Sequence, residues 1–146
     1  MAPQVRKADA DECWAAAHKT PIESLIGGLQ ASEKCFTVLH EDRPIAMFGV
    51  VARGPASPDF PRIGIVWMLG TDEVIDLWRA FGRWSKVWLG EVAYGYDALM
   101  NYVDARNTRH LRWLHWLGFE TVKVHNGHGP EKLPFHEVVK LTVEHV

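Results

Sequence analysis

The stretch that decides the fold is DALMNYVDARNTRHLRWLHWLGF, residues 97–119. Residues 99–104 are mostly apolar and have the length of a strand, and Asn107 follows as a residue type that caps helix starts. Leucines then recur at helical spacing until Gly118, the residue type that most often ends a helix. The stretch therefore predicts a strand, a short helix through Leu117 and a further strand from Phe119.

Neighbouring segments extend this pattern into a sheet. Residues 34–40 and 45–52 flank the turn 41–44 and predict a hairpin. Residues 63–69 are almost wholly apolar, which is typical of a strand buried on both faces. Further strands are predicted at residues 4–7, 119–125 and 136–143. Near the N-terminus, Asp9 and Asp11 offer N-cap oxygens for a helix, and residues 22–29 predict a second helical piece.

A long amphipathic helix is indicated after Gly70, capped by Thr71 or Asp72 and ended by Gly95. Its apolar residues recur at spacings of three and four: Val74, Leu77, Trp78, Phe81, Trp84, Trp88 and Val92. The three tryptophans of this stripe are expected to be packing residues, whereas Trp116 is the better candidate for a partner surface.

Composition limits the class of protein. The chain has 146 residues, 47% hydrophobic and 23% charged, with a net charge of -2. These values predict a single globular domain over residues 1–146 and make nucleic acid an unlikely partner. Cys13 and Cys35 are too few for a disulfide framework, which favours an intracellular protein. No secretory signal or membrane span is predicted, because the longest apolar runs are short.

The element order predicts an α/β (α+β) fold with a mixed sheet of about six to seven strands flanked by helices. Residues 97–119 resemble the strand, asparagine and helix block of GNAT acetyltransferases. A closer resemblance is to the small internal virion protein family of T7-like phages, carried by Asn101-Tyr102-Val103, Asn107-Thr108, His110, Arg112 and Gly118. The resemblance implies a GNAT-like fold, acetyl-CoA as the cofactor if the protein is active, and Asn107 as a cofactor contact.

Three departures from the family's enzymes bear on activity. The segment after Leu69 should be a glycine-rich pyrophosphate loop, but it reads GTDEVID, and its acidic residues would repel a pyrophosphate. Leu114 stands where many members place a tyrosine as general acid. The strand 63–69 has no carboxylate to serve as a general base. Enzymatic activity is thus left open.

Candidate site residues follow from these positions. Asp104 is a candidate base and Tyr102 a candidate acid, because residues two apart share a face of a strand; an ion pair of Asp104 with Arg106 is the alternative. The cofactor-binding candidates are Asn107, Leu69, Arg79 and Arg83. Asn107 is also a natural helix cap, and the cations Arg79, Arg83 and Lys86 also fit a solvated helix face. Asn101 is expected to pair with a neighbouring loop.

A metal site is weighed and not predicted. His125, His128 and His136 lie near one another in the sequence, but the first two fall in a glycine-rich segment without the rigid spacing of a ligand set.

Two functions compete. One is a phage- or prophage-type GNAT-fold protein with a degenerate acyl-CoA site. It would act in virion morphogenesis or host interaction through phage or host protein contacts, in the host cytoplasm or the virion. The alternative is an active acyl-CoA-dependent N-acetyltransferase for an unknown amine. A nucleic-acid-binding module is the third reading, carried only by the basic clusters.

Overall fold

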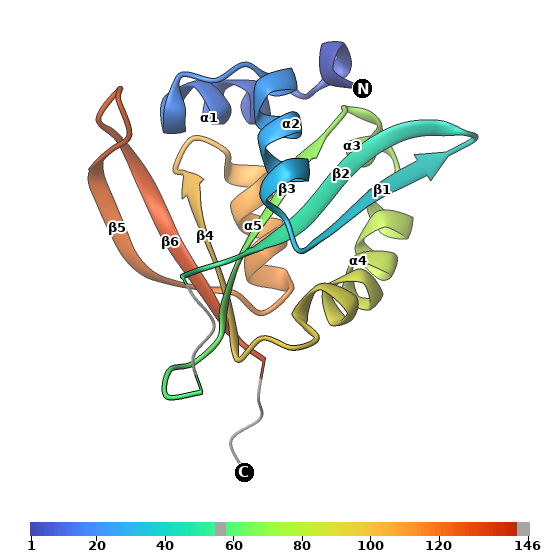
Figure 1. Ribbon diagram of the computed structural model, residues 1–146. Helices are drawn as coiled ribbons and strands as arrows, with labels where there is room; N and C mark the ends of the chain where they lie inside the picture. The colour runs from blue at the N-terminus through green and yellow to red at the C-terminus, as the bar shows by residue number, and fades with distance from the viewer. Residues whose placement is uncertain (55–57, 143–146) are drawn as a thin grey trace.

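The computed structural model describes residues 1–54 and 58–142 of the chain (Figure 1). Its elements are a 3-10 helix Ala2–Gln4, α1 Lys7–Ala17, α2 Pro21–Ala31, β1 Lys34–His40, β2 Arg43–Ala52, β3 Ile63–Gly70, α3 Glu73–Asp76, α4 Trp78–Ala93, β4 Ala98–Asp104, α5 Thr108–Trp116, β5 Glu120–His128 and β6 Leu133–Leu141. The predicted mixed sheet flanked by helices is confirmed. None of the described helices is long and apolar enough to cross a membrane.

The sheet has six strands in the order β1-β2-β3-β4-β6-β5. All neighbours are antiparallel except β3 and β4, which run parallel. Their pairing covers only Ile63–Ile65 against Ala98–Met100. Beyond it the two strands separate, and β4 stays paired with β6 along its whole length. The centre of the sheet is therefore split toward the C-terminal ends of β3 and β4.

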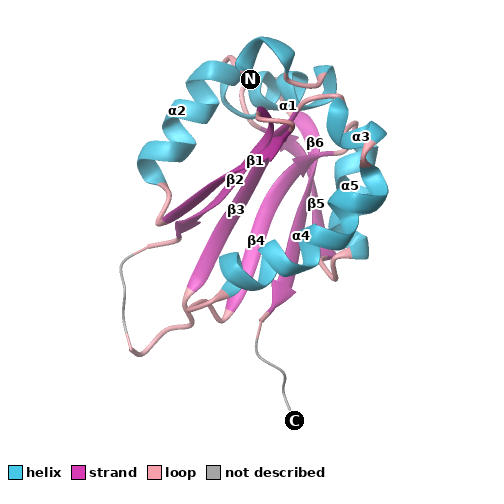
Figure 2. Ribbon diagram, turned by 90° about the vertical axis from the view of Figure 1, so that its right-hand side faces the viewer, coloured by secondary structure: helices cyan, strands magenta, loops and turns pink. Residues whose placement is uncertain are grey.

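Helices cover both faces of the sheet, with α1 and α2 on one side and α4 and α5 on the other (Figure 2). The main core lies on the α4–α5 side, where Leu99 and Val103 of β4 pack with Leu111 and Leu114 of α5. Since alternate residues of a strand face opposite ways, Tyr102 and Asp104 lie on the α1 side.

The N-terminal segment differs from the prediction. Residues 4–7 form no strand, and Val5 makes a single bridge to Thr71. The predicted Asp9 and Asp11 caps are wrong, because α1 begins at Lys7 with Arg6 at the N-cap and without a side-chain cap bond. Asp9 is instead buried inside the protein. The second helix is better defined than predicted, since Thr20 and Glu23 form a reciprocal capping box.

The predicted long helix is two helices that meet at Leu77. Glu73 of α3 pairs with Arg43 of β2, at 3.1 Å between Oε2 and the guanidinium. Val74 is buried in the same cluster as Ile45. These contacts tie α3 to the N-terminal end of β2, whereas α4 packs on the face of the sheet, so one straight helix cannot satisfy both.

The tryptophan stripe divides in the same way. Trp88 stacks on Phe48 and meets Phe81 edge to face, so it is a packing residue as predicted. Trp78 and Trp84 are more than half exposed, which makes the packing prediction wrong for both. Trp116 is also exposed.

The C-terminal hairpin is longer than predicted. β5 extends to His128, and β6 begins at Leu133 rather than at residue 136. The predicted end of the last strand, Val143, lies outside the described residues.

Candidate active site

The split between β3 and β4 is bridged by two carboxylates of α1. Asp9 Oδ2 accepts a hydrogen bond from the backbone N–H of Gly70, the last residue of β3, at 3.1 Å. Glu12 Oε1 accepts one from the backbone N–H of Asp104, the last residue of β4, at 2.6 Å. Asp9 and Glu12 are three residues apart and share a face of α1. The helix thus supplies the partners that the separated strands cannot give each other.

Asp9 is the centre of a buried polar cluster that we call the α1 network: Arg6, Asp9, Glu12, Asn107 and His110. Asp9 Oδ1 accepts from the Arg6 guanidinium at 3.3 Å and from the Asn107 amide nitrogen at 2.9 Å. Asp9 and Asn107 are only 1% and 2% exposed. A buried carboxylate with three donors is fully satisfied, so Asp9 fixes α1 to the end of β3 and to the start of α5.

Glu12 is the weakly compensated carboxylate of the α1 network. Burial raises its pKa from the usual 4.5 to about 8, and the charges of Asp9 and Asp104 add to the rise, while the Asp104 N–H bond and Arg6 oppose it. Glu12 therefore holds a proton at neutral pH that an exposed glutamate would have lost.

His110 faces Glu12 from α5. Its Nδ1 lies 3.9 Å from Glu12 Oε2 and has no hydrogen-bond partner, although the side chain is almost completely buried. Burial lowers the pKa of His110, and Arg6 lowers it further, while Asp9 opposes the shift. Within residues 1–54 and 58–142, the one group of His, Cys, Asp or Glu side chains whose ligand atoms converge is Asp9, Glu12 and His110.

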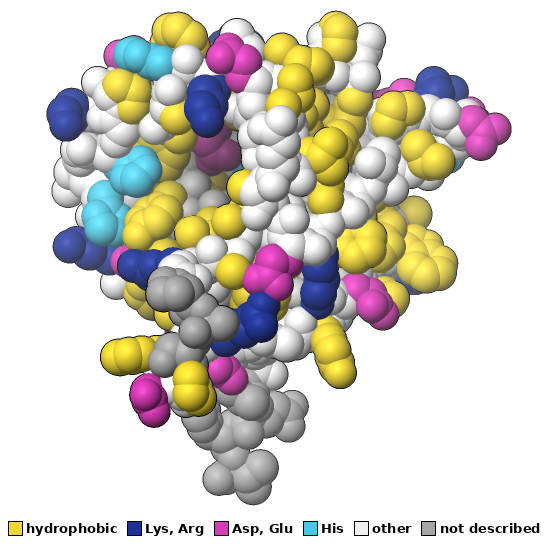
Figure 3. Space-filling view, in the orientation of Figure 1, with side chains coloured by type: hydrophobic (Ala, Val, Ile, Leu, Met, Phe, Trp, Pro, Cys, Tyr) yellow, Lys and Arg dark blue, Asp and Glu magenta, His cyan; other side chains and the backbone are white. Residues whose placement is uncertain are grey.

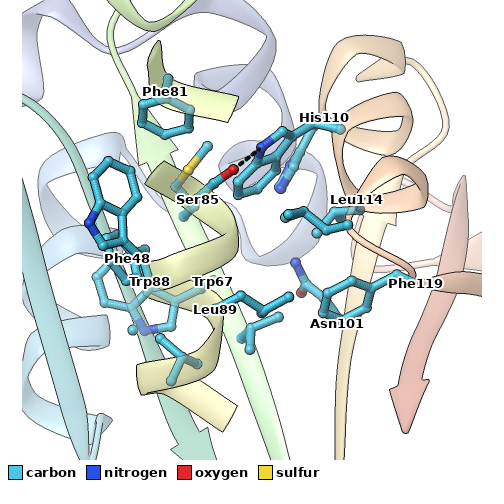
Figure 4. A pocket seen from close by; sticks show the side chains of 16 residues that line it. Phe48, Trp67, Phe81, Ser85, Trp88, Leu89, Asn101, His110, Leu114 and Phe119 are labelled. Carbon is cyan, nitrogen blue, oxygen red and sulfur yellow. Dashed lines mark hydrogen bonds between the residues drawn. The ribbon is translucent and has the colours of Figure 1, made fainter. Parts of the chain in front are cut away.

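His110 also reaches an apolar cavity of about 50 Å³ beside the split, on the α4–α5 side (Figure 4). Aromatic and aliphatic side chains from β2, β3, α4 and α5 form most of its wall, including Phe48, Trp88 and Leu114. The Asn101 side-chain oxygen accepts a bond from the Tyr102 N–H, not from a loop as predicted, and its amide nitrogen points into the cavity. The cavity suits a small uncharged group.

A larger groove of about 890 Å³ lies next to this cavity and shares Met68, Phe81, His110 and Trp113 with it. Six cations line it: Arg6, Arg79, Arg83, Lys86, Arg109 and Arg112. None of its described lining residues is an aspartate or glutamate. In the described part of the chain, Arg6 is paired with Asp9, and the other five cations form no ion pair. Such a groove attracts a polyanion.

The structure places the four predicted cofactor residues in different surroundings. Arg79 and Arg83 line the groove. Leu69 is buried in β3 and borders neither the groove nor the cavity. Asn107 stands at the N-cap position of α5 without the predicted side-chain cap bond, because its side chain turns to Asp9 and Arg6.

The acidic residues at the start of α3 do not face the groove, contrary to the expected repulsion of a pyrophosphate. Glu73 pairs with Arg43 of β2, and neither Asp72 nor Asp76 lines the groove. The cations come instead from the side of α4 and from α5.

Of the two predicted catalytic candidates, Asp104 is buried and accepts three side-chain hydrogen bonds from Arg106, at 2.7–3.1 Å. This is the ion pair that the sequence offered as the alternative. Tyr102 donates to Glu137 Oε1 at 3.3 Å and stacks on His128. Histidine side chains gather on this side over β5 and β6 (Figure 3).

The three histidines considered as metal ligands do not converge. His125 lies 3.5 Å from Glu137, His128 stacks on Tyr102, and His136 pairs with Thr121.

Sequence reasoning missed Arg6, Glu12 and His110 as site residues and assigned Asp9 to a cap. One signal was present: Asp9 and Glu12 stand at i and i+3 beside small apolar residues, on the face of α1 that must be buried.

The chain has the GNAT fold, as comparison with solved structures shows. The NatC complex bound to Gag peptide and CoA contains a chain that matches with a TM-score of 0.66 and 10% identity over 93% of this chain and 88% of that one. The yncA protein from Salmonella typhimurium with its cofactor acetyl-CoA matches with a TM-score of 0.64 and 13% identity, over 88% and 79%.

A GNAT-family acetyltransferase from Bacillus anthracis gives a TM-score of 0.59 and 11% identity, over 85% of this chain and 74% of that one. No family model and no curated protein matches the chain. The likeness is therefore one of fold.

Proposed function

We propose that this protein binds an acyl-CoA thioester in the cationic groove and transfers the acyl group to an amine. The observation that carries the proposal is the groove itself, with five unpaired cations and no carboxylate among its described lining residues. Clustered exposed cations create a positive potential that attracts an anion, and CoA carries its negative charge on a pyrophosphate and a further phosphate.

The parts of the site fit the parts of such a ligand. Arg79, Arg83 and Arg112 offer forked donors to phosphate oxygens. The exposed rings of Trp78 and Trp116 offer flat surfaces to a nucleobase. The small apolar cavity next to the groove, with the Asn101 amide in its wall, offers room for the acyl end of the thioester.

The reaction needs little from the protein beyond this arrangement. The bound thioester supplies an activated acyl carbon, and the amine nitrogen attacks it, forming the C–N bond as the C–S bond breaks. One proton of the amine ends on the departing sulfur, so the products are an amide and a free thiol. Positioning two reactants in this way accounts for most of the acceleration in simple acyl transfer. Leu114 in place of the family's tyrosine therefore does not abolish transfer.

The test compares acetyl-CoA with acetyl-pantetheine, which carries the same thioester without phosphates. Calorimetric titration should show that acetyl-CoA binds at least tenfold tighter, because the groove recognises the phosphates. Arg79→Ala combined with Arg83→Ala should remove most of that difference. Lys19→Ala combined with Lys123→Ala, which removes two exposed cations away from the groove, should leave it unchanged.

The second candidate is the predicted degenerate site in a phage- or prophage-type protein that acts through protein contacts. It is supported by the resemblance of residues 101–118 and by the departures from the family's enzymes. If millimolar acetyl-CoA neither binds nor shifts the unfolding midpoint, the acyltransferase proposal fails and this second function is favoured.

A further inference from the structure

His110 stands where the two cavities and the α1 network meet. It lines both the apolar cavity and the cationic groove (Figure 4), and its ring centre lies 5.8 Å from that of Trp113. Its Nδ1 is turned away from them, toward Glu12 Oε2 at 3.9 Å. A group that binds in the cavity thus meets the imidazole from the side opposite to Glu12.

His110 Nδ1 is a buried nitrogen that has no hydrogen-bond partner among the described residues. A buried nitrogen without a partner is costly, and a small rotation of Glu12 would bring Oε2 within reach. Glu12 Oε1 is already fixed by the Asp104 N–H, so Oε2 is the oxygen left for His110. The arrangement is that of a carboxylate that orients an imidazole.

A proton fits this cluster better than a metal ion. The Arg6 guanidinium lies 3.3 Å from Asp9 Oδ1 and already supplies positive charge. Both oxygens of Asp9 accept N–H donors, from Arg6, Asn107 and Gly70, so a cation would have to displace them. Glu12 Oε2 and His110 Nδ1, which face each other, accept no such hydrogen bonds from other groups in the described part of the chain.

We infer that His110 is the proton acceptor of the acyl transfer and that Glu12 is the positioning residue that holds its ring. This inference rests on the proposed function. Glu12 Oε2 accepts from Nδ1–H, which leaves the Nε2 lone pair free for the proton of the attacking nucleophile.

The step balances. The nucleophile's lone pair forms a bond to the acyl carbon, its proton passes to His110 Nε2, and the C–S bond breaks to give a thiolate. The imidazolium, stabilised by the Glu12 carboxylate, then returns the proton to that thiolate. The products are the acylated nucleophile and free thiol, and both residues regain their starting states.

Charged groups from every side set the pH at which the pair works. Glu12 faces Asp9 on α1, Asp104 on β4, His110 on α5 and the cation Arg6, with Arg106 further out. Burial raises the pKa of Glu12 and lowers that of His110, so both side chains favour their uncharged forms near pH 7. Activity should therefore rise with pH near neutrality, as Glu12 loses its proton.

The first test uses the wild-type protein alone. Nitrogen-15 chemical shifts of His110 at pH 8.5 should report the tautomer with the proton on Nδ1. In Glu12→Gln, whose amide can donate to Nδ1, the proton should move to Nε2. A wild-type ring that carries its proton on Nε2 would overturn the inference whatever the protein binds.

The second test measures thiol release from acetyl-CoA with water as the acceptor, so that no amine has to be known. His110→Gln should lower the rate at least 100-fold, the usual size of a general-base effect. Glu12→Gln should lower it about tenfold and flatten its rise with pH, and Glu12→Asp should restore part of both. His115→Gln, on the exposed side of the same helix, should keep the wild-type rate.

The outcomes separate the two proposals. A wild-type protein that does not bind acetyl-CoA disproves the proposed function, while the tautomer test still decides on the pair. Binding without thiol release, or a His110→Gln variant with wild-type rate and pH profile, overturns the proton-acceptor role. Loss of activity on adding a chelator, restored by Zn²⁺ or Mn²⁺, would also overturn it, because the cluster would then be a metal site.

Discussion

The cationic groove and the α1 network lie next to each other and share Arg6 and His110, yet they are built in opposite ways. Five of the groove's six cations, all but Arg6, are left without counter-charges in the described part of the chain. The α1 network surrounds its acidic groups with donors, so that Asp9 alone accepts from three residues. Unpaired charge at a surface is suited to binding, whereas paired charge in the interior is suited to fixing the backbone.

Glu12 and His110 combine features of the groove and of the α1 network. They are buried like the rest of the α1 network but incompletely paired, with 3.9 Å between their facing atoms. Buried groups of this kind carry shifted pKa values, and such groups gather at functional sites. The comparison can be tested by substituting residues of the α1 network and of the groove and measuring stability and ligand binding.

The largest effect is expected for Asp9→Ala. The substitution leaves the Arg6 guanidinium, the Asn107 amide and the Gly70 N–H without their shared acceptor, all of them buried. Removing one member of a buried charged pair costs about 3–5 kcal/mol of unfolding free energy. Denaturant unfolding measures the loss.

Asp11→Ala is the matched control, since Asp11 lies on the same helix in an exposed pair with Lys7. Its cost should stay below about 1 kcal/mol. Equal losses for the two variants would show that the α1 network contributes no special stability, and the contrast with the groove would then be wrong.

The sequence predicted the sheet far better than the site. Hydrophobic periodicity located β1 to β4 within two residues, because strand burial repeats within each segment. The basic stripe of α4 was visible for the same reason. The α1 network was not, since Asp9 and Asn107 are 98 positions apart and nothing local to either residue indicates their contact. Asp9 was predicted as the N-cap of the first helix because its neighbours along the chain are typical of a helix start.

The break at Leu77 was hidden for a related reason. The apolar spacing from Val74 to Val92 is continuous, and the division comes from the contact of α3 with β2. Local propensity cannot report such a tertiary constraint.

The next effect concerns pH. The folded state raises the pKa of Glu12 from 4.5 to about 8, so between these values it binds more protons than the unfolded chain. The contribution of Glu12 to stability therefore falls as pH rises through this window, by up to about 1.4 kcal/mol per pH unit. Glu12→Gln removes the titration but keeps the shape of the side chain.

The stability of Glu12→Gln relative to wild type should accordingly increase from pH 5.5 to pH 7.5. Unfolding midpoints in denaturant at several pH values measure the difference. A constant difference across this range would mean that Glu12 is not the buried, weakly compensated group that the geometry implies.

A smaller effect is expected when the groove loses its charge. Arg83→Glu combined with Arg112→Glu should weaken acetyl-CoA binding at least tenfold at low salt, about 1.4 kcal/mol. Added salt should reduce the difference, because screening weakens exposed charges most. Stability should change by less than about 0.5 kcal/mol, since both side chains are exposed. Lys123→Glu, on exposed β5, is the control for charge reversal alone.

The smallest effect tests whether the groove wall has any structure of its own. Lys86 Nζ lies 4.3 Å from the centre of the Trp116 ring and so joins α4 to α5 across the groove. An exposed cation–π contact contributes about 0.5–1 kcal/mol. A double-mutant cycle with Lys86→Met and Trp116→Leu should return a coupling energy of about that size in denaturant unfolding. A coupling of zero would show that the two helices hold their spacing through the core alone. A measurable coupling would instead make Lys86 a residue that shapes the groove as well as charging it.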